Sequence, residues 1–251
     1  MDLDFKISTN LIVATHITGI FDVNRTATLA NDDFSLVSDW AISISKLGLQ
    51  AIIFHNNFTE KTCRLYESAN LQFVKINYDT RFNPNIYRYV LYERFLQYCT
   101  SSIKNIFFTD ISDVIVLKNP FVEKYFIENP YCIFCGDETK ILENDWMKLH
   151  SEHLRMQIAD YADYELKFKN HTLLNCGIIG GSITVVHPFI NSLSSIHQQY
   201  NSSNQTAYTG DMGAFNYLIR TQYNNFVKHG NPINTVFKNY STDESCWFKH
   251  K

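Results

Sequence analysis

Residues Phe107 to Phe121 read FFTDISDVIVLKNPF, an apolar and β-branched stretch that two aspartates interrupt. An apolar run of this kind is typical of a buried strand. Burying an unpaired carboxylate costs several kcal/mol, so we expect Asp110 and Asp113 to lie at a strand end, to meet a cation, or both.

The segments before this stretch alternate between strand and helix patterns. We expect strands at 11–17, 50–56, 71–77 and 105–117, and helices at 35–47, 60–69 and 87–99. This alternation predicts an α/β fold, a mostly parallel sheet flanked by helices, with a site at the carboxyl ends of the strands. Asp110 follows the apolar run IFF, so it falls at such an end.

The second half is less regular. We expect a strand at 131–137, a helix at 145–160, a glycine-broken strand pair at 173–186, helices at 188–200 and 210–222, and a polar loop from 224 to the exposed terminus. No linker or repeat separates the two halves, which predicts a single domain over 1–251.

Composition excludes several classes of protein. The net charge of −3 gives no reason to expect nucleic acid as a partner. The start, MDLDFKIST, lacks a basic leader region, and no stretch approaches the about 18 apolar residues of a transmembrane helix. We therefore expect a soluble, cytoplasmic protein.

Two of the six cysteines, Cys132 and Cys135, form a C-x-x-C motif. A zinc site would need a second pair with similar spacing, and the sequence has none. A redox motif normally opens a helix, whereas YCIFC has the pattern of a strand. We expect core thiols.

The aspartate pair carries a resemblance to a known family. Asp-x-x-Asp between an apolar strand and VIVLKNPF resembles the Asp-x-Asp region of metal-dependent glycosyltransferases of the GT-A fold, in particular the family 8 retaining galactosyl- and glucosyltransferases. Asp113 matches the second aspartate of that motif, and Asp110 lies one residue further out than the first. Two carboxylates at a sheet edge suit Mn²⁺ or Mg²⁺, which keep positions open for substrate oxygens.

Two further stretches resemble segments that contact the sugar donor in that family. YERFLQY (Tyr92–Tyr98) is similar to a Tyr-x-Arg-Leu segment, which makes Arg94 a candidate for contacting the donor near its phosphates; the alternative is a solvated helix-face arginine. LNCGIIGG (Leu174–Gly181) is similar to an Asn-Ala-Gly segment that lines the donor sugar. The resemblance places Asn175 and Gly177 there, where small residues let the backbone approach a ligand.

Two more stretches complete the family's order. GDMGAFN (Gly210–Asn216) resembles the segment beside the reacting carbon, with Asp211 as the catalytic aspartate and Met212 where a glutamine often proposed as the nucleophile would stand. His250 and Lys251 resemble a late histidine metal ligand and a phosphate-binding lysine, although the family places that lysine several residues after the histidine. His229 is the rival metal ligand.

The segment after the first strand resembles the family's nucleotide-base site. Thr15, His16, Asp22 and Arg25 are the candidates in THITGIFDVNR. The alternatives are a strand-end histidine for His16 and a surface ion pair for Asp22 and Arg25.

The resemblance implies a GT-A domain with a Rossmann-like sheet. Residues 1–120 would form its nucleotide-binding half, and 121–251 a smaller mixed-sheet half for sugar and acceptor, with the C-terminal tail. The enzyme would move a sugar from a nucleoside-diphosphate sugar, with UDP expected, to a hydroxyl of a glycan or glycoconjugate, with retention of configuration. Two alternatives stay open: an inactive sugar-nucleotide-binding module of a larger protein, and a nucleotidyltransferase. A nucleotidyltransferase would need a glycine- and lysine-rich loop after the first strand, and the segment THITGIFDVNR matches that composition poorly.

Overall fold

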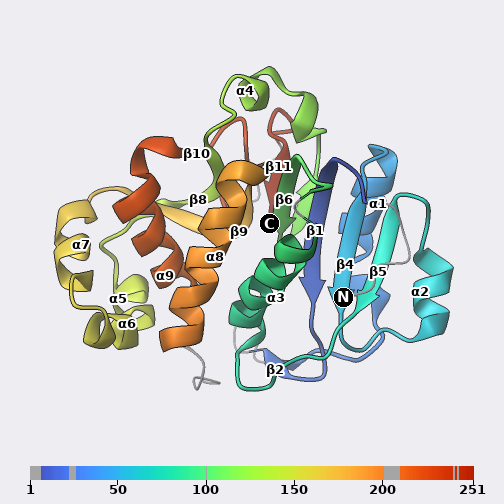
Figure 1. Ribbon diagram of the computed structural model, residues 1–251, viewed down its shortest axis with the longest axis horizontal. Coiled ribbons are helices and arrows are strands. Elements are labelled where there is room, and N and C mark those ends of the chain that lie inside the picture. The colour runs from blue at the N-terminus through green and yellow to red at the C-terminus, as the bar shows by residue number, and fades with distance from the viewer. Residues whose placement is uncertain (1–6, 23–26, 100, 201–209, 240, 242) are drawn as a thin grey trace.

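The computed structural model describes residues 7–22, 27–99, 101–200, 210–239, 241 and 243–251 (Figure 1). The central sheet is built from β1 (Asn10–His16), β4 (Ala51–His55), β5 (Leu71–Lys75), β6 (Asn105–Thr109), β8 (Ile133–Ile141), β9 (Thr172–Ser182) and β10 (Val227–His229). The order of these seven described strands is β10-β8-β9-β6-β1-β4-β5. β9 is antiparallel to both of its neighbours, and every other pairing is parallel. The expected α/β fold with a mostly parallel sheet is confirmed.

The helices are α1 (Ser38–Lys46), α2 (Glu60–Tyr66), α3 (Pro84–Cys99), α4 (Lys124–Ile127), α5 (Asp145–His150), α6 (Glu152–Gln157), α7 (Tyr161–Phe168), α8 (Ile183–Tyr200) and α9 (Asp211–Leu218). A short π-helical segment, Ile219–Tyr223, continues α9. The helix expected at 145–160 is split into α5 and α6 at Ser151, and α7 was not expected.

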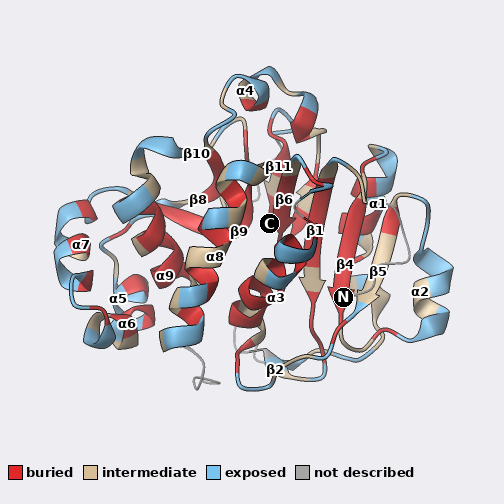
Figure 2. Ribbon diagram, in the orientation of Figure 1, coloured by how far each residue is buried: buried red, intermediate tan, exposed pale blue. Residues whose placement is uncertain are grey.

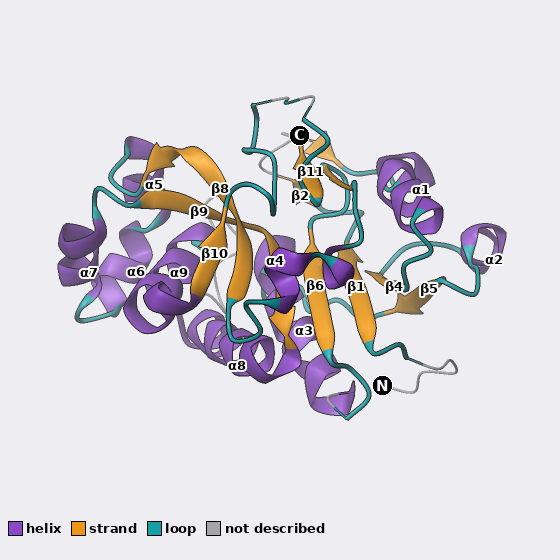
Figure 3. Ribbon diagram, turned by 90° about the horizontal axis from the view of Figure 1, so that it is seen from above, coloured by secondary structure: helices purple, strands orange, loops and turns teal. Residues whose placement is uncertain are grey.

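The sheet is buried on both faces, as Figure 2 shows for its central strands. α3 and α8 lie on one face of the sheet and α1 on the other (Figure 3). Leu11 and Val13 of β1 belong to the core with α3 and α8, while Ile12 and Ala14 belong to the core with α1. Successive residues of a strand point to opposite faces, so an uninterrupted apolar strand contributes to two cores.

The strand expected at 105–117 is two strands. β6 ends at Thr109, the chain turns through Asp110 and Asp113, and β7 (Val114–Val116) then pairs with β11 (Phe248–His250) in a separate two-stranded sheet. The physical reason is that the two carboxylates have no place within a sheet that is apolar on both faces. A second small sheet joins β2 (Phe21–Asp22) to β3 (Ala27–Thr28).

The glycine-broken strand pair expected at 173–186 is also wrong. β9 is one continuous strand, and α8 begins directly after it at Ile183. Gly180 does not break the strand because it lies against the Phe107 ring of β6, where a Cβ would overlap that ring. The glycine therefore serves close packing rather than a turn.

The polar loop expected from 224 onward is wrong in two places, because β10 is a strand of the central sheet and the last residues form β11. Trp247 and Phe248 are fully buried, and they pack into the core that contains α1 and β7. β11 is consequently part of the folded core rather than an exposed tail.

The six cysteines all lie in the described part of the chain and are free thiols. Cys135 is buried in β8, as expected of a core thiol, and Cys132 is half-buried. No helix of the described residues is both long enough and apolar enough to span a membrane.

Candidate active site at the carboxyl edge of the sheet

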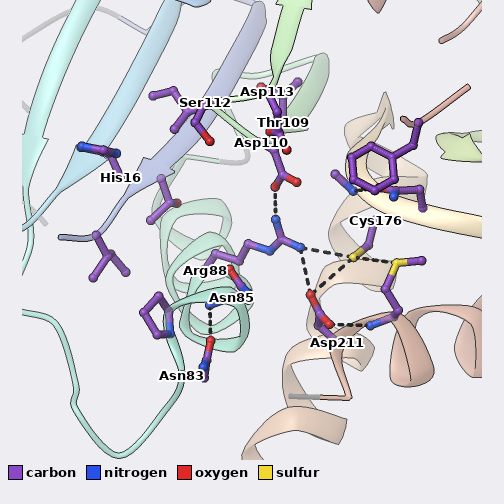
Figure 4. A pocket seen from close by; sticks show the side chains of 18 of the residues that line it. His16, Asn83, Asn85, Arg88, Thr109, Asp110, Ser112, Asp113, Cys176 and Asp211 are labelled. Carbon is purple, nitrogen blue, oxygen red and sulfur yellow. Dashed lines mark hydrogen bonds and ion pairs between the residues drawn. The ribbon is translucent and has the colours of Figure 1, made fainter. Parts of the chain in front are cut away.

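A cavity of about 710 Å³ opens at the carboxyl ends of β1 and β6 and extends over β8 and β9 (Figure 4). Its walls come from both halves of the chain: the β1 end and α3 on one side, and β8, α5 and the start of α9 on the other. Parallel strands bring their carboxyl ends to one edge, which explains why residues distant in sequence meet there.

Asp110, Asp113 and His250 form a cluster beside this cavity, with one side-chain oxygen or nitrogen of each within 4.8 Å of the others. The turn after β6 supplies the two aspartates. The Asp110 backbone N–H donates to the Gly177 carbonyl at 2.7 Å. β11 supplies His250, which lies opposite Val114 in the β7–β11 pair. The small sheet thus brings the histidine to the aspartates.

His250 is buried and lacks the hydrogen bonds that buried polar groups normally have. It is 1% exposed, and neither ring nitrogen has a hydrogen-bond partner among the described residues. Burial lowers the pKa of His250 to about 4, although the nearby Asp110 charge opposes this effect. A neutral imidazole with unused nitrogens, 3.9 Å from the Asp113 carboxylate, has the chemistry of a metal ligand.

Gly177 has no side chain to fill the space between Asp110 and His250. A Cβ at this position would lie 2.6 Å from an Asp110 carboxylate oxygen and 2.6 Å from Cε1 of His250. The Asn175 side-chain oxygen accepts from the Gly177 N–H at 2.7 Å, and its amide donates to Glu138 at 2.9 Å. Asn175 therefore fixes the strand segment that faces the cluster. Burial raises the pKa of Glu138, which also lines the cavity.

Arg88 of α3 connects the cluster to a third carboxylate, that of Asp211. Its guanidinium is paired with Asp110 and lies 3.5 Å from Asp211, and it also contacts the Cys176 thiol at 3.2 Å (Figure 4). The Arg88 side chain is only 11% exposed, so its charge acts where water screens it little.

Asp211 opens α9 and faces the cavity. It follows Gly210, whose φ of 65° is in the left-handed region that glycine adopts readily. One Asp211 carboxylate oxygen accepts from the Met212 N–H at 2.9 Å, and the other faces Arg88. The helix start and the arginine together set the direction of this carboxylate.

Most of the candidates from the sequence meet at this site. The cavity is lined by Thr15, His16, Asp110, Asp113, Asn175, Gly177 and Asp211. The Thr15 hydroxyl donates to that of Tyr92 at 3.0 Å. Asp22 lies in β2, and Arg25 falls outside the described residues.

Three candidates lie elsewhere. Arg94 is exposed on α3 and is not among the residues that line the described cavity. The Lys251 ammonium contacts Asp39 at 2.6 Å and does not reach that lining either. His229, the rival metal ligand, contacts Asp137 at 3.1 Å and is not part of the Asp110–Asp113–His250 cluster.

The structure adds residues that sequence reasoning missed. Besides Arg88, the cavity wall includes Lys140, Trp146, His150 and Lys238. Arg88 had a signal in the sequence, because it is a charged residue within the apolar run IYRYVL. The others lie in segments without any pattern that indicates a site.

The chain matches no model of a known protein family, and no curated protein matches it at a significant level.

Proposed function

We propose that this protein is a metal-dependent glycosyltransferase that moves a sugar from a nucleoside-diphosphate sugar, with UDP as the nucleotide, to a hydroxyl of a glycan or glycoconjugate. The observation that carries the proposal is the Asp110–Asp113–His250 cluster beside a cavity of about 710 Å³. That volume is within the range of small-molecule sites, roughly 300–1,000 Å³.

The donor set fits Mn²⁺ or Mg²⁺, with Asp110, Asp113 and His250 as the residues that would hold it. Carboxylates suit both ions, and an imidazole favours Mn²⁺ over Mg²⁺ because it is a softer ligand than oxygen. Bound there, the ion would supply positive charge to the diphosphate that leaves during transfer.

The charged side chains around the cavity fit the remaining parts of the reaction. Arg88 lies beside Asp110, where its guanidinium can neutralise the leaving phosphate. Asp211, 3.5 Å from Arg88, would face the anomeric carbon and stabilise the positive charge that develops on it. We assign the nucleotide to the side of the cavity formed by Thr15 and His16.

The transfer itself is a substitution at the anomeric carbon. The acceptor oxygen forms a bond to that carbon, and the bond from carbon to the β-phosphate oxygen breaks with its electron pair going to the phosphate. The hydroxyl proton passes to the departing phosphate oxygen. Met212 is beside Asp211 and offers no nucleophilic carboxylate or amide, so we favour attack from the leaving-group face, which retains configuration.

The test is to incubate the protein with Mn²⁺ and a panel of nucleotide sugars, and to measure released nucleoside diphosphate with and without EDTA. Metal-dependent release supports the transferase. Metal-dependent UDP binding without release identifies an inactive sugar-nucleotide-binding module instead. Release of pyrophosphate from a nucleoside triphosphate and a sugar phosphate identifies a nucleotidyltransferase. Absence of any metal-dependent nucleotide binding overturns the proposal.

A further inference from the structure

Trp146 of α5 is a large aromatic side chain on the cavity wall that remains 39% exposed. The chain has three tryptophans, and the other two, Trp40 and Trp247, are fully buried. The Trp146 indole is stacked on the His150 ring, with centroids 3.5 Å apart and an interplanar angle of 26°. One face of the indole is thus covered by an imidazole, while the side chain keeps exposed surface at the cavity.

His150 holds this arrangement in place. It is 5% exposed, and its Nδ1 is 2.8 Å from the Trp146 carbonyl oxygen, so the two residues are joined through ring and backbone. Burial lowers the pKa of His150, and its hydrogen bond to the Trp146 carbonyl and the Asp211 charge oppose that shift. A side chain fixed before a ligand arrives loses little conformational entropy on binding.

The position of the stack separates it from the proposed nucleotide side. In the sheet, β1 lies on one side of β6, whereas β9 and β8 lie on the other. Thr15 and His16 are at the end of β1, while α5 packs against α9, the helix that Asp211 opens. Trp146 therefore belongs to the side of the cavity formed by β8, α5 and α9, the helix that Asp211 opens, whereas Thr15 and His16 belong to the β1 side.

The neighbouring groups suit a polyhydroxylated ligand. Glu138, Thr139 and Lys140 of β8 line the same cavity, and Lys238 adds a second ammonium group to its lining. An aromatic face carries partial negative charge, so it attracts the weakly positive C–H groups of an apolar sugar face. The polar side chains around it can bond the hydroxyl groups at the rim of such a ring.

We infer that Trp146, supported by His150, is the platform of the acceptor subsite, and that the acceptor is a carbohydrate ring rather than a protein side chain or a lipid alcohol. This inference rests on the proposed function for its assignment to the acceptor. Binding of sugar at Trp146 can be measured without any turnover.

The first experiment uses intrinsic fluorescence of the full chain with Mn²⁺ and UDP present. Since Trp40 and Trp247 are buried, Trp146 is the tryptophan that acrylamide quenches and N-bromosuccinimide modifies first. The probes are methyl β-galactoside, methyl α-glucoside, lactose and maltose, with a serine- and tyrosine-containing peptide and octanol as comparisons. We expect at least one saccharide to protect Trp146, and the peptide and octanol to give no protection. Protection by the peptide or octanol alone, or by no probe, overturns the inference.

The second experiment uses variants. Trp146→Ala should weaken binding of the protecting saccharide, measured by calorimetry, by about tenfold or more, and Trp146→Phe should retain part of the affinity because it keeps an aromatic face. Leu149→Ala is the matched control, since Leu149 is on the same helix, is 48% exposed and is not among the residues lining the cavity.

In turnover assays, Trp146→Ala should raise the acceptor KM and leave UDP affinity unchanged. Weaker UDP binding in Trp146→Ala, with unchanged saccharide binding, would assign Trp146 to the donor and overturn the inference. Failure of all nucleotide binding with intact saccharide protection would instead remove the proposed function.

Discussion

At the scale of single residues, the proposed metal site depends most on His250. A buried donor or acceptor left without a hydrogen bond costs about 1–3 kcal/mol. Both ring nitrogens of His250 are in that position among the described residues, and two carboxylates lie beside them. An ion bound to Asp110, Asp113 and His250 would satisfy one nitrogen and offset the carboxylate charges at the same time.

Asp113 provides the direct test of that cluster. Asp113→Ala removes one carboxylate but keeps the backbone carbonyl that accepts from the Lys251 N–H, so the fold should stay intact. We expect the variant to lose Mn²⁺-dependent UDP binding in calorimetry with little change in Tm. Asp145→Asn, at an exposed carboxylate, is the control. UDP affinity that is the same with Mn²⁺ and with EDTA in the unmodified protein would contradict the metal site.

Asp211 can be tested by separating its two roles. Asp211→Asn keeps an oxygen that can accept from the Met212 N–H at the start of α9, but it removes the charge that faces Arg88. We expect kcat to fall by about 10²-fold or more, with donor KM nearly unchanged, since the charge acts in the transition state. Asp163→Asn, in the first turn of α7, controls for a helix-end effect alone. A kcat within about threefold of the unmodified protein would remove Asp211 from the mechanism.

Arg88 and Arg94 show what sequence can and cannot decide about a single side chain. Arg88 directly follows Tyr87, Arg94 lies two residues after Tyr92 in the same helix, and the family-like Tyr-x-Arg spacing favours Arg94. Six residues along an α-helix correspond to about 600° of rotation, so the two side chains leave the helix in different directions. The cavity is on the Arg88 side. Only the packing of α3 against the sheet settles this choice.

At the scale of elements, β11 joins the core to the site. Its residues alternate, so that Phe248 and His250 are buried while Lys249 is half-buried between them. Phe248 packs in the same core as Trp40 and Val114, and His250 reaches the two aspartates. The strand that fills the core thus also positions the third proposed ligand.

This arrangement predicts a large loss of stability when a buried side chain of β11 is shortened. Phe248→Ala should lower the free energy of unfolding by about 3–5 kcal/mol, because it leaves a cavity in a fully buried site. Lys249→Ala, the neighbouring position, should change it by no more than about 0.5 kcal/mol. Urea unfolding monitored by circular dichroism measures both. Equal values for the two variants would show that β11 is not part of the cooperative core.

The elements of the first half are predictable from local sequence pattern. The predictions that were wrong concern elements whose structure depends on partners distant in the sequence. The strand–helix alternation up to α3 is visible because apolar residues recur at strand and helix spacing. The turn after Thr109 depends on β7 leaving the sheet to pair with β11, which comes from the far end of the sequence. The continuity of β9 at Gly180 depends on the Phe107 ring of a neighbouring strand. No local pattern contains either partner.

At the scale of the whole molecule, the apolar cores lie on the two faces of the sheet, and the polar cavity lies at one edge. Both faces are apolar, whereas charged and polar groups gather where the carboxyl ends of β1 and β6 meet β8 and β9. The sequence predicts a site at this edge through Asp110, and in the structure α3, α9 and β11 also contribute side chains to the cavity and the cluster there. A rigid core beneath such a site keeps its charges in place without reorganisation.

The same apolar core also determines how stability depends on pH. His55 and His197 are buried away from the site, and burial lowers the pKa of His55 to about 4 and that of His197 to about 3. Unfolding returns each imidazole to its ordinary pKa of about 6.5, so below that pH the unfolded chain binds protons that the folded protein excludes. The free energy of unfolding should therefore be nearly constant between pH 7 and 7.5 and fall as the pH drops from about 6.5 to 4, with His55 alone contributing on the order of 3 kcal/mol.

Urea unfolding at several pH values between 7.5 and 4.5 tests this dependence. The carboxyl groups with lowered pKa values, such as Asp32 and Asp79, affect stability chiefly near and below their ordinary pKa of 3.8. Burial raises the pKa of Glu138, whose effect on stability therefore has the opposite sign to that of the histidines, so the test compares the slopes of variants. His55→Asn keeps a side-chain acceptor for the Phe58 N–H that His55 now accepts at 3.2 Å, but it cannot take up a proton. The slope of stability against pH should consequently be shallower in His55→Asn and unchanged in His171→Asn, whose side chain is exposed. A slope that His55→Asn leaves unaltered would show that protons enter the folded core at this position as readily as they bind the unfolded chain.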